Sequence, residues 1–203
     1  MKIVVRASAT QQQEWKSKPT GNASVFFINE DEVLYNYDAD VYFDLLFTTD
    51  SHAITTQKPV FVNAVLETLS ELPKNCIRIN AWPGFLARQV VELVCSEENK
   101  QFVKEIMTAL GWNYIFAPDV RGMVALRSIA MIINEAYFAI GDNVSTKENI
   151  DIAMKLGTNY PFGPFEWANI IGLKNIYNLL SALSAEESRY IAAPFLKQEV
   201  ITT

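Results

Sequence analysis

The sequence predicts two domains: an α/β domain with a mostly parallel sheet over residues 1–117, and an all-helical domain over residues 118–203. Up to residue 116, short runs rich in β-branched residues alternate with polar or helical connections, which is typical of a parallel sheet. From residue 123, the apolar residues follow a helical spacing instead. Half of the 203 residues are apolar, which is enough for a core in one or two domains.

Six runs in the first domain favour strands. Residues 8–20 are polar and fit a short helix or a loop. Residues 97–110 carry apolar residues at helical spacing, and Gly111 can end that helix because glycine adopts positive φ without strain. The expected strands lie at residues 2–6, 24–29, 40–47, 59–65, 76–80 and 113–116, with a short helical segment at residues 66–72.

Helices are expected throughout the second domain. Residues 123–140 are apolar nearly all round, which is typical of a buried helix. Ser145 with Glu148 has the spacing of a capping box, in which two side chains satisfy the first backbone N–H groups of a helix. Ser184 with Glu187 has the same spacing and predicts the start of a final helix.

Composition excludes some functions. The net charge of −6 and the isoelectric point near 4.9 argue against a nucleic-acid-binding protein, although a local basic patch could still bind a small anion. Cys76 and Cys95 are too few for a disulfide framework and are expected to be reduced core residues. The sequence has no run of about 20 apolar residues and no recognisable signal peptide, so we expect a cytoplasmic protein without a membrane span. No metal site is predicted.

Residues 151–167 carry the most specific pattern. A helical stripe runs to Gly157, which is expected to end the helix. Residues 160–164 form a turn, and Pro164 suits the first turn of a new helix that begins near Phe165. The pattern D-x-A-M-x-x-G-x-x-x-P-F-G-P-F-E resembles the helix-turn-helix in the C-terminal domain of 3-hydroxyacyl-CoA dehydrogenases, whose usual form has Met at the first Phe.

The resemblance continues upstream with decreasing strength. Residues 121–127, followed by residues 134–136, are similar to the family segments P-G-F-x-x-N-R and x-E-A. Arg127 matches the Arg, and the resemblance implies that it lines the substrate cleft. Leu126 stands where the family has an active-site Asn.

Residues 78–92 look like the family segment H-F-F-N-P-x-x-x-x-x-L-V-E. Glu92 matches the Glu, and Asn80 stands where the family has its catalytic His. A register shifted by one residue places Ile79 there, so neither register supplies a His. The resemblance also implies that Asn63 contacts the substrate. It implies a shortened Rossmann-like sheet domain, a helical C-terminal domain, and NAD-linked oxidation of 3-hydroxyacyl-CoA in fatty-acid metabolism.

The family reaction needs a base for the hydroxyl proton, and a His hydrogen-bonded to a Glu provides it. The amide of Asn80 does not titrate near neutral pH, but it can hydrogen-bond a carbonyl oxygen. Glu92 is therefore either a remnant of the active site or an ordinary salt-bridged residue at a strand end. The only histidine, His52, lies in a polar loop and is expected to be a surface residue.

NAD, the cofactor that the resemblance implies, normally sits on a glycine-rich turn after the first strand. Residues 7–13 read A-S-A-T-Q-Q-Q, and no glycine occurs before Gly21. The Cβ atoms of such a turn would crowd a pyrophosphate. Ser8 and Thr10 could offer hydroxyls to a phosphate, although a capped helix start is favoured.

The first domain is also short for a complete dinucleotide-binding domain, which indicates that some helices are missing. A sheet face without helices needs other cover, so its aromatic residues fit a subunit contact or a shallow ligand groove. These aromatic residues are Phe26, Phe27, Tyr35, Tyr37, Tyr42, Phe43 and Phe47.

Three functions remain open. The chain could be an active dehydrogenase, a catalytically inactive relative that binds an acyl-CoA near Asn63, Asn80, Glu92 and Arg127, or a scaffold that dimerises. In the family the helical domain forms the dimer interface, so a homodimer is expected. A candidate surface, for which a place in the core of the helical domain is slightly favoured, consists of Ile170, Ile171, Leu173, Ile176, Leu179 and Leu180.

Overall fold

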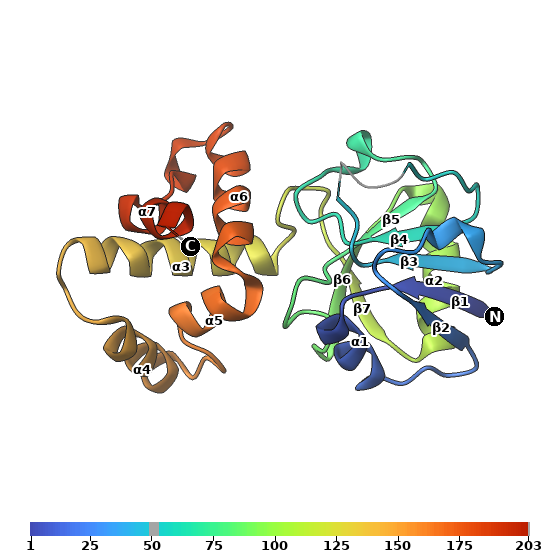
Figure 1. Cartoon of the computed structure of the whole chain (residues 1–203), viewed down its shortest axis with the longest axis horizontal. Coiled ribbons are helices and arrows are strands. Elements are labelled where there is room, and N and C mark those ends of the chain that lie inside the picture. The colour runs from blue at the N-terminus through green and yellow to red at the C-terminus, as the bar shows by residue number, and fades with distance from the viewer. Residues whose placement is uncertain (49–52, 203) are drawn as a thin grey trace. The chain divides into compact units, whose positions relative to one another are not determined.

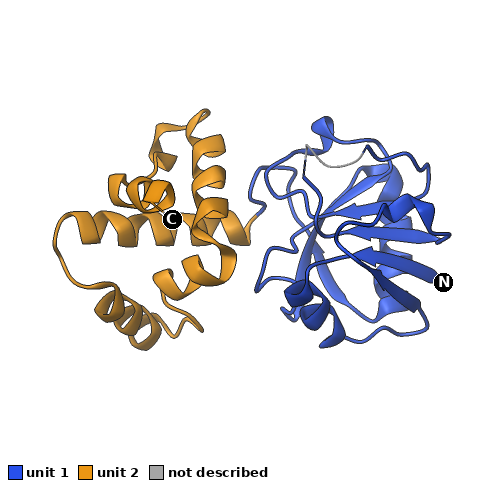
Figure 2. Cartoon of the chain, in the orientation of Figure 1, with its two compact units in different colours: residues 1–123 blue, residues 124–203 orange. Residues whose placement is uncertain are grey.

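The structure, a computed structural model, describes residues 1–48 and 53–202. It divides into two compact units, Met1–Met123 and Val124–Thr203 (Figure 2). His52, the only histidine, lies outside the described residues.

The division between the units follows residue 123, whereas the sequence placed it after residue 117. Hydrogen bonds attach the intervening segment to the first unit. The backbone N–H of Gly122 donates to the carbonyl oxygen of Val65 at 2.8 Å. Both carboxylate oxygens of Asp119 accept from the backbone N–H of Leu69, at 3.0 and 3.1 Å.

A seven-stranded sheet forms the first unit, with the strand order β2-β1-β3-β4-β5-β6-β7 (Figure 1). Neighbouring strands are parallel except β5 and β6, so the predicted mostly parallel sheet is confirmed. Strand β6 was not predicted, because Glu92 interrupts its apolar run. The bounds are β1 Lys2–Arg6, β2 Ser24–Ile28, β3 Val41–Asp44, β4 Val60–Val62, β5 Cys76–Ile79, β6 Val90–Val94 and β7 Asn113–Phe116.

Helices α1 (Ala9–Lys16) and α2 (Lys100–Leu110) pack on one face of this sheet. Helix α2 ends as predicted, since Gly111 adopts φ 73°. Trp15 of α1 is fully buried against strand and α2 residues, which makes it a centre of this core. The main members of the core are Ile3, Val5, Trp15, Phe43, Phe61, Ile77, Leu93, Val103, Met107, Leu110 and Trp112.

The opposite face carries no α-helix among the described residues. It is covered by connecting segments, including the 3-10 helix Leu34–Asn36 and Ala39. Tyr42 is buried in this second core, and Phe26 and Tyr37 are exposed. The chain therefore covers most of the face with its own loops. A second 3-10 helix, Leu69–Glu71, stands where a short helical segment was expected.

Helices alone build the second unit, as predicted. Its longest helix, α3, contacts α4, α5, α6 and α7. Residues Ile176, Leu179 and Leu180 are fully buried, so they belong to the core of the unit. The bounds are α3 Ala125–Gly141, α4 Lys147–Thr158, α5 Pro164–Ile171, α6 Leu173–Ser184, the 3-10 helix Ser188–Tyr190 and α7 Pro194–Thr202.

Several helix ends differ from the prediction. Helix α4 is capped by Thr146, whose hydroxyl accepts from the N–H of Asn149, and not by Ser145. Helix α4 also continues through Gly157 to Asn159, which adopts φ 56° and ends it. Asparagine tolerates this left-handed conformation because its side chain can hydrogen-bond locally.

The final capping box was also wrong. Ser184 is the last residue of α6, and Glu187 precedes a 3-10 turn, so the last α-helix begins only at Pro194. Helix α3 is not buried all round either, because Phe138 is exposed. Residue spacing alone does not show where a helix begins when two neighbouring hydroxyls or turns can both cap it, because tertiary packing selects between them.

Candidate functional site

The carboxyl ends of five parallel strands, β1 to β5, lie at one edge of the sheet. The chain passes from β1 to β2 on one side and returns to β3 on the other side of β1. In open α/β sheets, ligands bind in the crevice at such a reversal, outside the carboxyl ends of the strands. Three of the four predicted site residues lie at or near this edge: Asn63 after β4, Asn80 after β5, and Glu92 on β6.

Asn80 and Glu92 form a buried pair. The antiparallel pairing of β5 with β6 places them opposite each other, and the backbone N–H of Asn80 donates to the carbonyl oxygen of Glu92 at 3.1 Å. The side-chain Nδ2 of Asn80 donates to Oε2 of Glu92 at 3.0 Å. The two residues are only 2% and 7% exposed. The structure thus brings together the two residues that were predicted as catalytic.

One polar atom of this pair has no hydrogen-bond partner among the described residues. This atom is Oδ1 of Asn80, which is buried. Because Nδ2 is directed to the carboxylate, Oδ1 must point away from it. An unpaired buried acceptor is unfavourable by about 1–3 kcal/mol, so a donor that reached Oδ1 would be stabilising.

Asn63, in contrast, uses its amide within the protein. Its Oδ1 accepts from the backbone N–H of Ala81 at 2.9 Å, and its Nδ2 donates to the carbonyl oxygen of Leu45 at 3.1 Å. These bonds join the residues that follow β3, β4 and β5. Asn63 therefore has a clear structural role, and its predicted contact with a substrate stays a prediction.

Arg127 lies in the second unit, on α3. Its Nε donates to the hydroxyl of Tyr190 at 2.7 Å, and its guanidinium lies over the Tyr190 ring at 4.8 Å from the centroid. A further nitrogen contacts Glu187 at 3.4 Å. These contacts fasten the 3-10 turn to α3, so the described partners of Arg127 are structural. Its predicted substrate contact also stays a prediction.

The turn between β1 and α1 does not fit a dinucleotide. Ser8 caps the helix: its hydroxyl accepts from the N–H of Gln11 at 3.3 Å, and its own N–H donates to the Gln11 side chain at 3.0 Å. Every residue of the turn has a Cβ, and its backbone cannot approach a pyrophosphate as glycines would. The favoured prediction of a capped helix start is confirmed.

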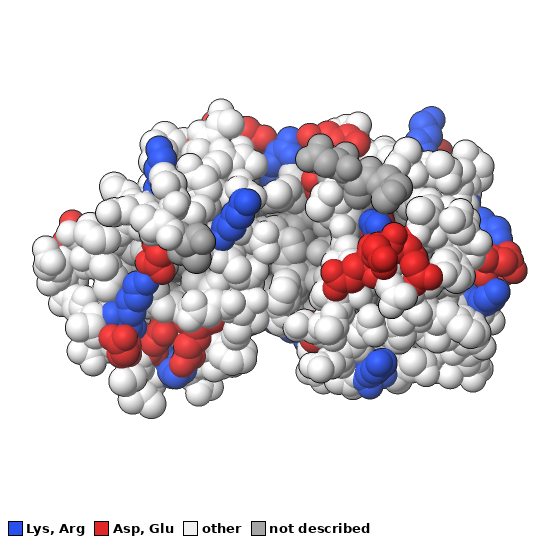
Figure 3. Space-filling view, viewed as in Figure 1, with Lys and Arg blue, Asp and Glu red and all other residues white. Residues whose placement is uncertain are grey.

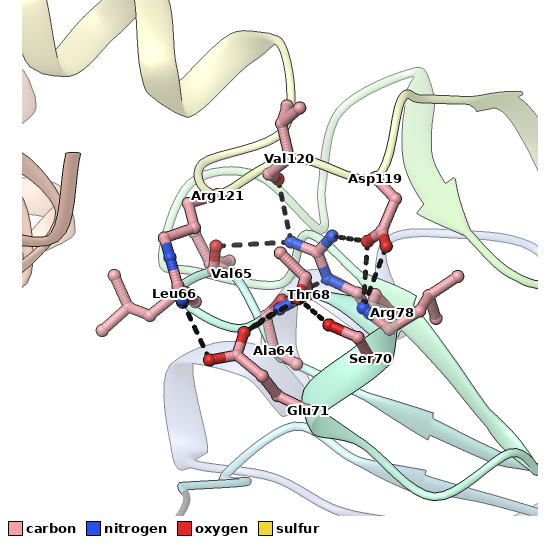
Figure 4. Close-up of polar contacts among 11 residues, drawn as sticks. Ala64, Val65, Leu66, Thr68, Ser70, Glu71, Arg78, Asp119, Val120 and Arg121 are labelled. Carbon is pink, nitrogen blue, oxygen red and sulfur yellow. Dashed lines mark hydrogen bonds and ion pairs between the residues drawn. The ribbon is translucent and has the colours of Figure 1, made fainter. Parts of the chain in front are cut away.

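A cluster of arginines and carboxylates near this edge was not predicted. Arg78 lies on β5 and is fully buried, and its side chain donates to Asp119 at 2.5 Å, to the carbonyl oxygen of Ala64 at 2.9 Å and to that of Val120 at 3.1 Å (Figure 4). Arg121 donates to Glu71 at 2.9 Å and to a backbone carbonyl. An arginine inside an otherwise apolar strand was the signal that could have revealed it.

Electrostatics within this cluster follow from the geometry. Hydrogen bonds from Arg121 and from the backbone N–H of Thr68 lower the pKa of Glu71 to about 2. Burial raises the pKa of Glu67, against the opposing charges of Arg78 and Arg121. The cluster joins the segment after β4 to the segment before the second unit, so its role is to hold these two segments together.

The most specific sequence motif, residues 151–167, is structural. Asp151 on α4 caps the next helix, because its carboxylate oxygens accept from the N–H groups of Phe165 at 2.8 Å and Glu166 at 3.2 Å. Gly163 leaves room for this cap, since a Cβ there would lie 2.2 Å from the Asp151 carboxylate. The helix begins at Pro164.

Metal and membrane sites find no support within the part of the chain that the structure describes. No three His, Cys, Asp or Glu side chains there are grouped to hold a metal ion. No described helix is both long enough and apolar enough to cross a membrane. On the face shown in Figure 3, the basic side chains lie singly among uncharged and acidic ones.

Comparison with known proteins identifies the helical unit. The family described as 3-hydroxyacyl-CoA dehydrogenase, C-terminal domain, matches residues 122–202. The 3-hydroxyadipyl-CoA dehydrogenase of Escherichia coli K12 is 41% identical over 85 residues, which are 41% of this chain and 18% of that enzyme. A probable 3-hydroxybutyryl-CoA dehydrogenase of Bacillus subtilis is 33% identical over 110 residues, or 53% of this chain and 38% of the relative. The chain thus spans well under two thirds of these curated relatives.

Solved structures extend the likeness to the whole fold. The (S)-3-hydroxybutyryl-CoA dehydrogenase of Ralstonia eutropha superposes with a TM-score of 0.74 at 15% identity, covering 99% of this chain and 93% of that one. The 3-hydroxybutyryl-CoA dehydrogenase of Escherichia coli K12 gives 0.73 at 14% identity, covering all of this chain and 56% of that one. The predicted fold, a Rossmann-like sheet domain followed by a helical C-terminal domain, is confirmed.

Proposed function

Because the chain belongs to the 3-hydroxyacyl-CoA dehydrogenase family, we propose that it binds an acyl-CoA thioester without the NAD-linked hydride transfer of that family. The observation that carries the proposal is the buried pair of Asn80 and Glu92, 3.0 Å apart. By the resemblance, these two residues stand where the family has its catalytic His and Glu, with an amide in place of the His.

The missing base is the main chemical argument. Oxidation of a 3-hydroxyl group requires a group that accepts its proton, and a side chain is effective when its pKa lies near the working pH. An asparagine amide neither accepts nor releases a proton in that range. Glu92 is buried, and its Oε2 accepts a hydrogen bond from this amide and not from a histidine.

Binding is supported by the unused hydrogen-bonding capacity of Asn80. Its Oδ1 accepts no bond among the described residues, and Nδ2 carries a second hydrogen besides the one directed to Glu92. A 3-hydroxyl group can donate to Oδ1, and a thioester or 3-keto oxygen can accept from Nδ2. The relatives are named for 3-hydroxybutyryl-CoA and 3-hydroxyadipyl-CoA, which makes short 3-hydroxyacyl thioesters the first ligands to test.

Isothermal titration of the whole chain with 3-hydroxybutyryl-CoA, butyryl-CoA and free CoA tests this proposal. We expect saturable binding of the thioesters and at least about tenfold weaker binding of free CoA, which corresponds to 1.4 kcal/mol. The variant Asn80→Ala should bind 3-hydroxybutyryl-CoA more weakly, and its circular dichroism spectrum should show that it remains folded. Equal binding of all three ligands, or no binding of any, would refute the proposal.

A dimeric scaffold is the second candidate function, and exposed apolar residues in the helical unit favour it. On α4, Leu156 is 83% exposed and Ile152 is 51% exposed. On another face of α4, which carries Ile150 and Met154, a pocket of about 460 Å³ opens between α3, α4 and α5. Its apolar lining consists of Met131, Ile132, Ala136, Ala139, Ile150, Met154 and Pro164. Apolar surface of this kind marks contact sites more often than isolated exposed residues do.

We propose that a second copy of the chain covers the exposed apolar face of α4 that carries Ile152 and Leu156. Light scattering coupled to gel filtration should then give twice the monomer mass, and Leu156→Glu should shift the protein to monomers. Lys174→Glu, a charge change elsewhere in the same unit, serves as the control. A monomeric parent protein at micromolar concentration would refute this second candidate.

A further inference from the structure

Dinucleotides bind in doubly wound sheets at the carboxyl ends of strands such as β1 and β3, and here a side chain of the protein itself lies at these ends. Gln11 lies in the first turns of α1 and is only 3% exposed. Its Nε2 donates to the carbonyl oxygen of Leu45 at 2.9 Å and to that of Ala81 at 2.8 Å. Leu45 follows β3 and Ala81 follows β5, so one amide joins α1 to the carboxyl edge of two strands.

We infer that Gln11 occupies the position at the carboxyl ends of β1 and β3 where a dinucleotide would bind, so that the chain folds with this position already filled. This inference does not rest on the proposed binding of an acyl-CoA, because it concerns a different part of the edge. It assigns a positioning role to a residue that sequence patterns would place at the surface.

All the polar atoms of the Gln11 side chain are used. Its Oε1 accepts from the N–H of Ser8 at 3.0 Å, and its two amide hydrogens serve Leu45 and Ala81. The backbone N–H of Gln11 donates to the Ser8 hydroxyl, so one of the helix donors that could bind a phosphate is occupied. A ligand that displaced this side chain would remove the hydrogen bonds that Gln11 makes to the Ala81 carbonyl oxygen and to the Ser8 N–H, and one of the two bonds to the Leu45 carbonyl oxygen.

Asn63 bonds to the same two residues. Its Nδ2 also donates to the Leu45 carbonyl oxygen, and its Oδ1 accepts from the backbone N–H of Ala81. Two amide side chains thus connect the same two backbone positions from α1 and from β4. Internal hydrogen bonds replace the ligand contacts that such an edge usually offers.

Direct titration with NADH, followed by its fluorescence, tests the inference without any acyl-CoA. We expect no saturable binding of NADH to the whole chain below about 1 mM. A dinucleotide-dependent dehydrogenase, titrated separately under the same conditions, provides the positive control. Saturable binding at micromolar NADH would overturn the inference.

The positioning role of Gln11 can be tested against a matched control, because Gln13 lies on the same helix. Gln11 is buried, whereas Gln13 is exposed on the same helix. We expect Gln11→Ala to lower the thermal midpoint by roughly 3 °C or more, and Gln13→Ala to leave it unchanged. Gln11→Met keeps the volume of the side chain but removes its donors, so its thermal midpoint should also be lower than that of the parent protein. This variant can still be measured if Gln11→Ala does not fold. Equal midpoints for the Gln11 and Gln13 variants would overturn the assigned role.

Discussion

At the residue scale, the environment decides what each polar side chain can do. Asn63 and Asn80 follow neighbouring strands, but the first has both amide atoms bonded internally and the second has one buried atom without a described partner. The sequence predicted both as site residues by resemblance alone. Gln11 escaped prediction, because only the folded edge places the Leu45 and Ala81 carbonyls within its reach.

The pairing of Asn80 with Glu92 predicts that two small substitutions both destabilise the protein, one of them in a pH-dependent way. Asn80→Ala removes a donor to a buried carboxylate but also removes the unpaired Oδ1, so we expect a loss of about 1–2 kcal/mol in the free energy of unfolding. Asn80→Asp places two carboxylates together and should be more destabilising at pH 7 than at pH 5. Urea unfolding at both pH values measures this, with Asn113→Ala on an exposed position as control. An Asp variant as stable as the parent at pH 7 would contradict the described geometry.

The ion pair of Arg121 with Glu71 predicts a dependence of stability on pH. The folded-state pKa of Glu71 is about 2, below its ordinary value of 4.5, so its contribution is present above pH 4.5 and is lost as the pH falls toward 2. Arg121→Ala should reduce this contribution and flatten the stability profile between pH 4.5 and pH 2. Thermal midpoints across this range measure the effect. Arg189 forms a more exposed ion pair with Glu187, so Arg189→Ala is the control and should leave the stability profile unchanged. An unchanged profile in Arg121→Ala would show that the ion pair of Arg121 with Glu71 does not cause the pH dependence.

At the element scale, long and strongly patterned segments were predictable and their ends were not. The six predicted strands and the helix before Gly111 were found, because period and glycine placement are local properties. The cap of α4 shifted from Ser145 to Thr146, and Gly157 proved to be inside the helix. Adjacent hydroxyls and an αL asparagine compete at such ends, and tertiary packing selects between them.

Two glycines in the same motif should respond in opposite ways to alanine. Gly163→Ala would force a Cβ against the Asp151 carboxylate that caps α5, so we expect a loss of roughly 2 kcal/mol or more. Gly157 lies inside α4 with open space around it, and Gly157→Ala should stabilise the protein by about 0.5–1 kcal/mol. Chemical unfolding of both variants measures this. A neutral Gly163→Ala would show that the cap does not hold the turn.

At the scale of the whole molecule, the helical unit carries the family identity and the sheet unit carries the departures. The family match covers residues 122–202, and the sheet has the order of a doubly wound fold with α-helices described on one face only. The resemblance predicted both units, because the specific motif fixes the helical turn. It could not predict how the shortened sheet covers its second face, since that depends on irregular loops such as the segment around Leu34.

Absorbance at 340 nm during incubation of the whole chain with NADH and acetoacetyl-CoA is the most direct test of the central claim. We expect the rate of NADH oxidation to equal that of a protein-free blank, because position 80 supplies no titratable group and Gln11 fills the position where a dinucleotide would bind. A rate above the blank that Glu92→Gln abolishes would contradict the claim and would restore this chain to the catalytic members of its family.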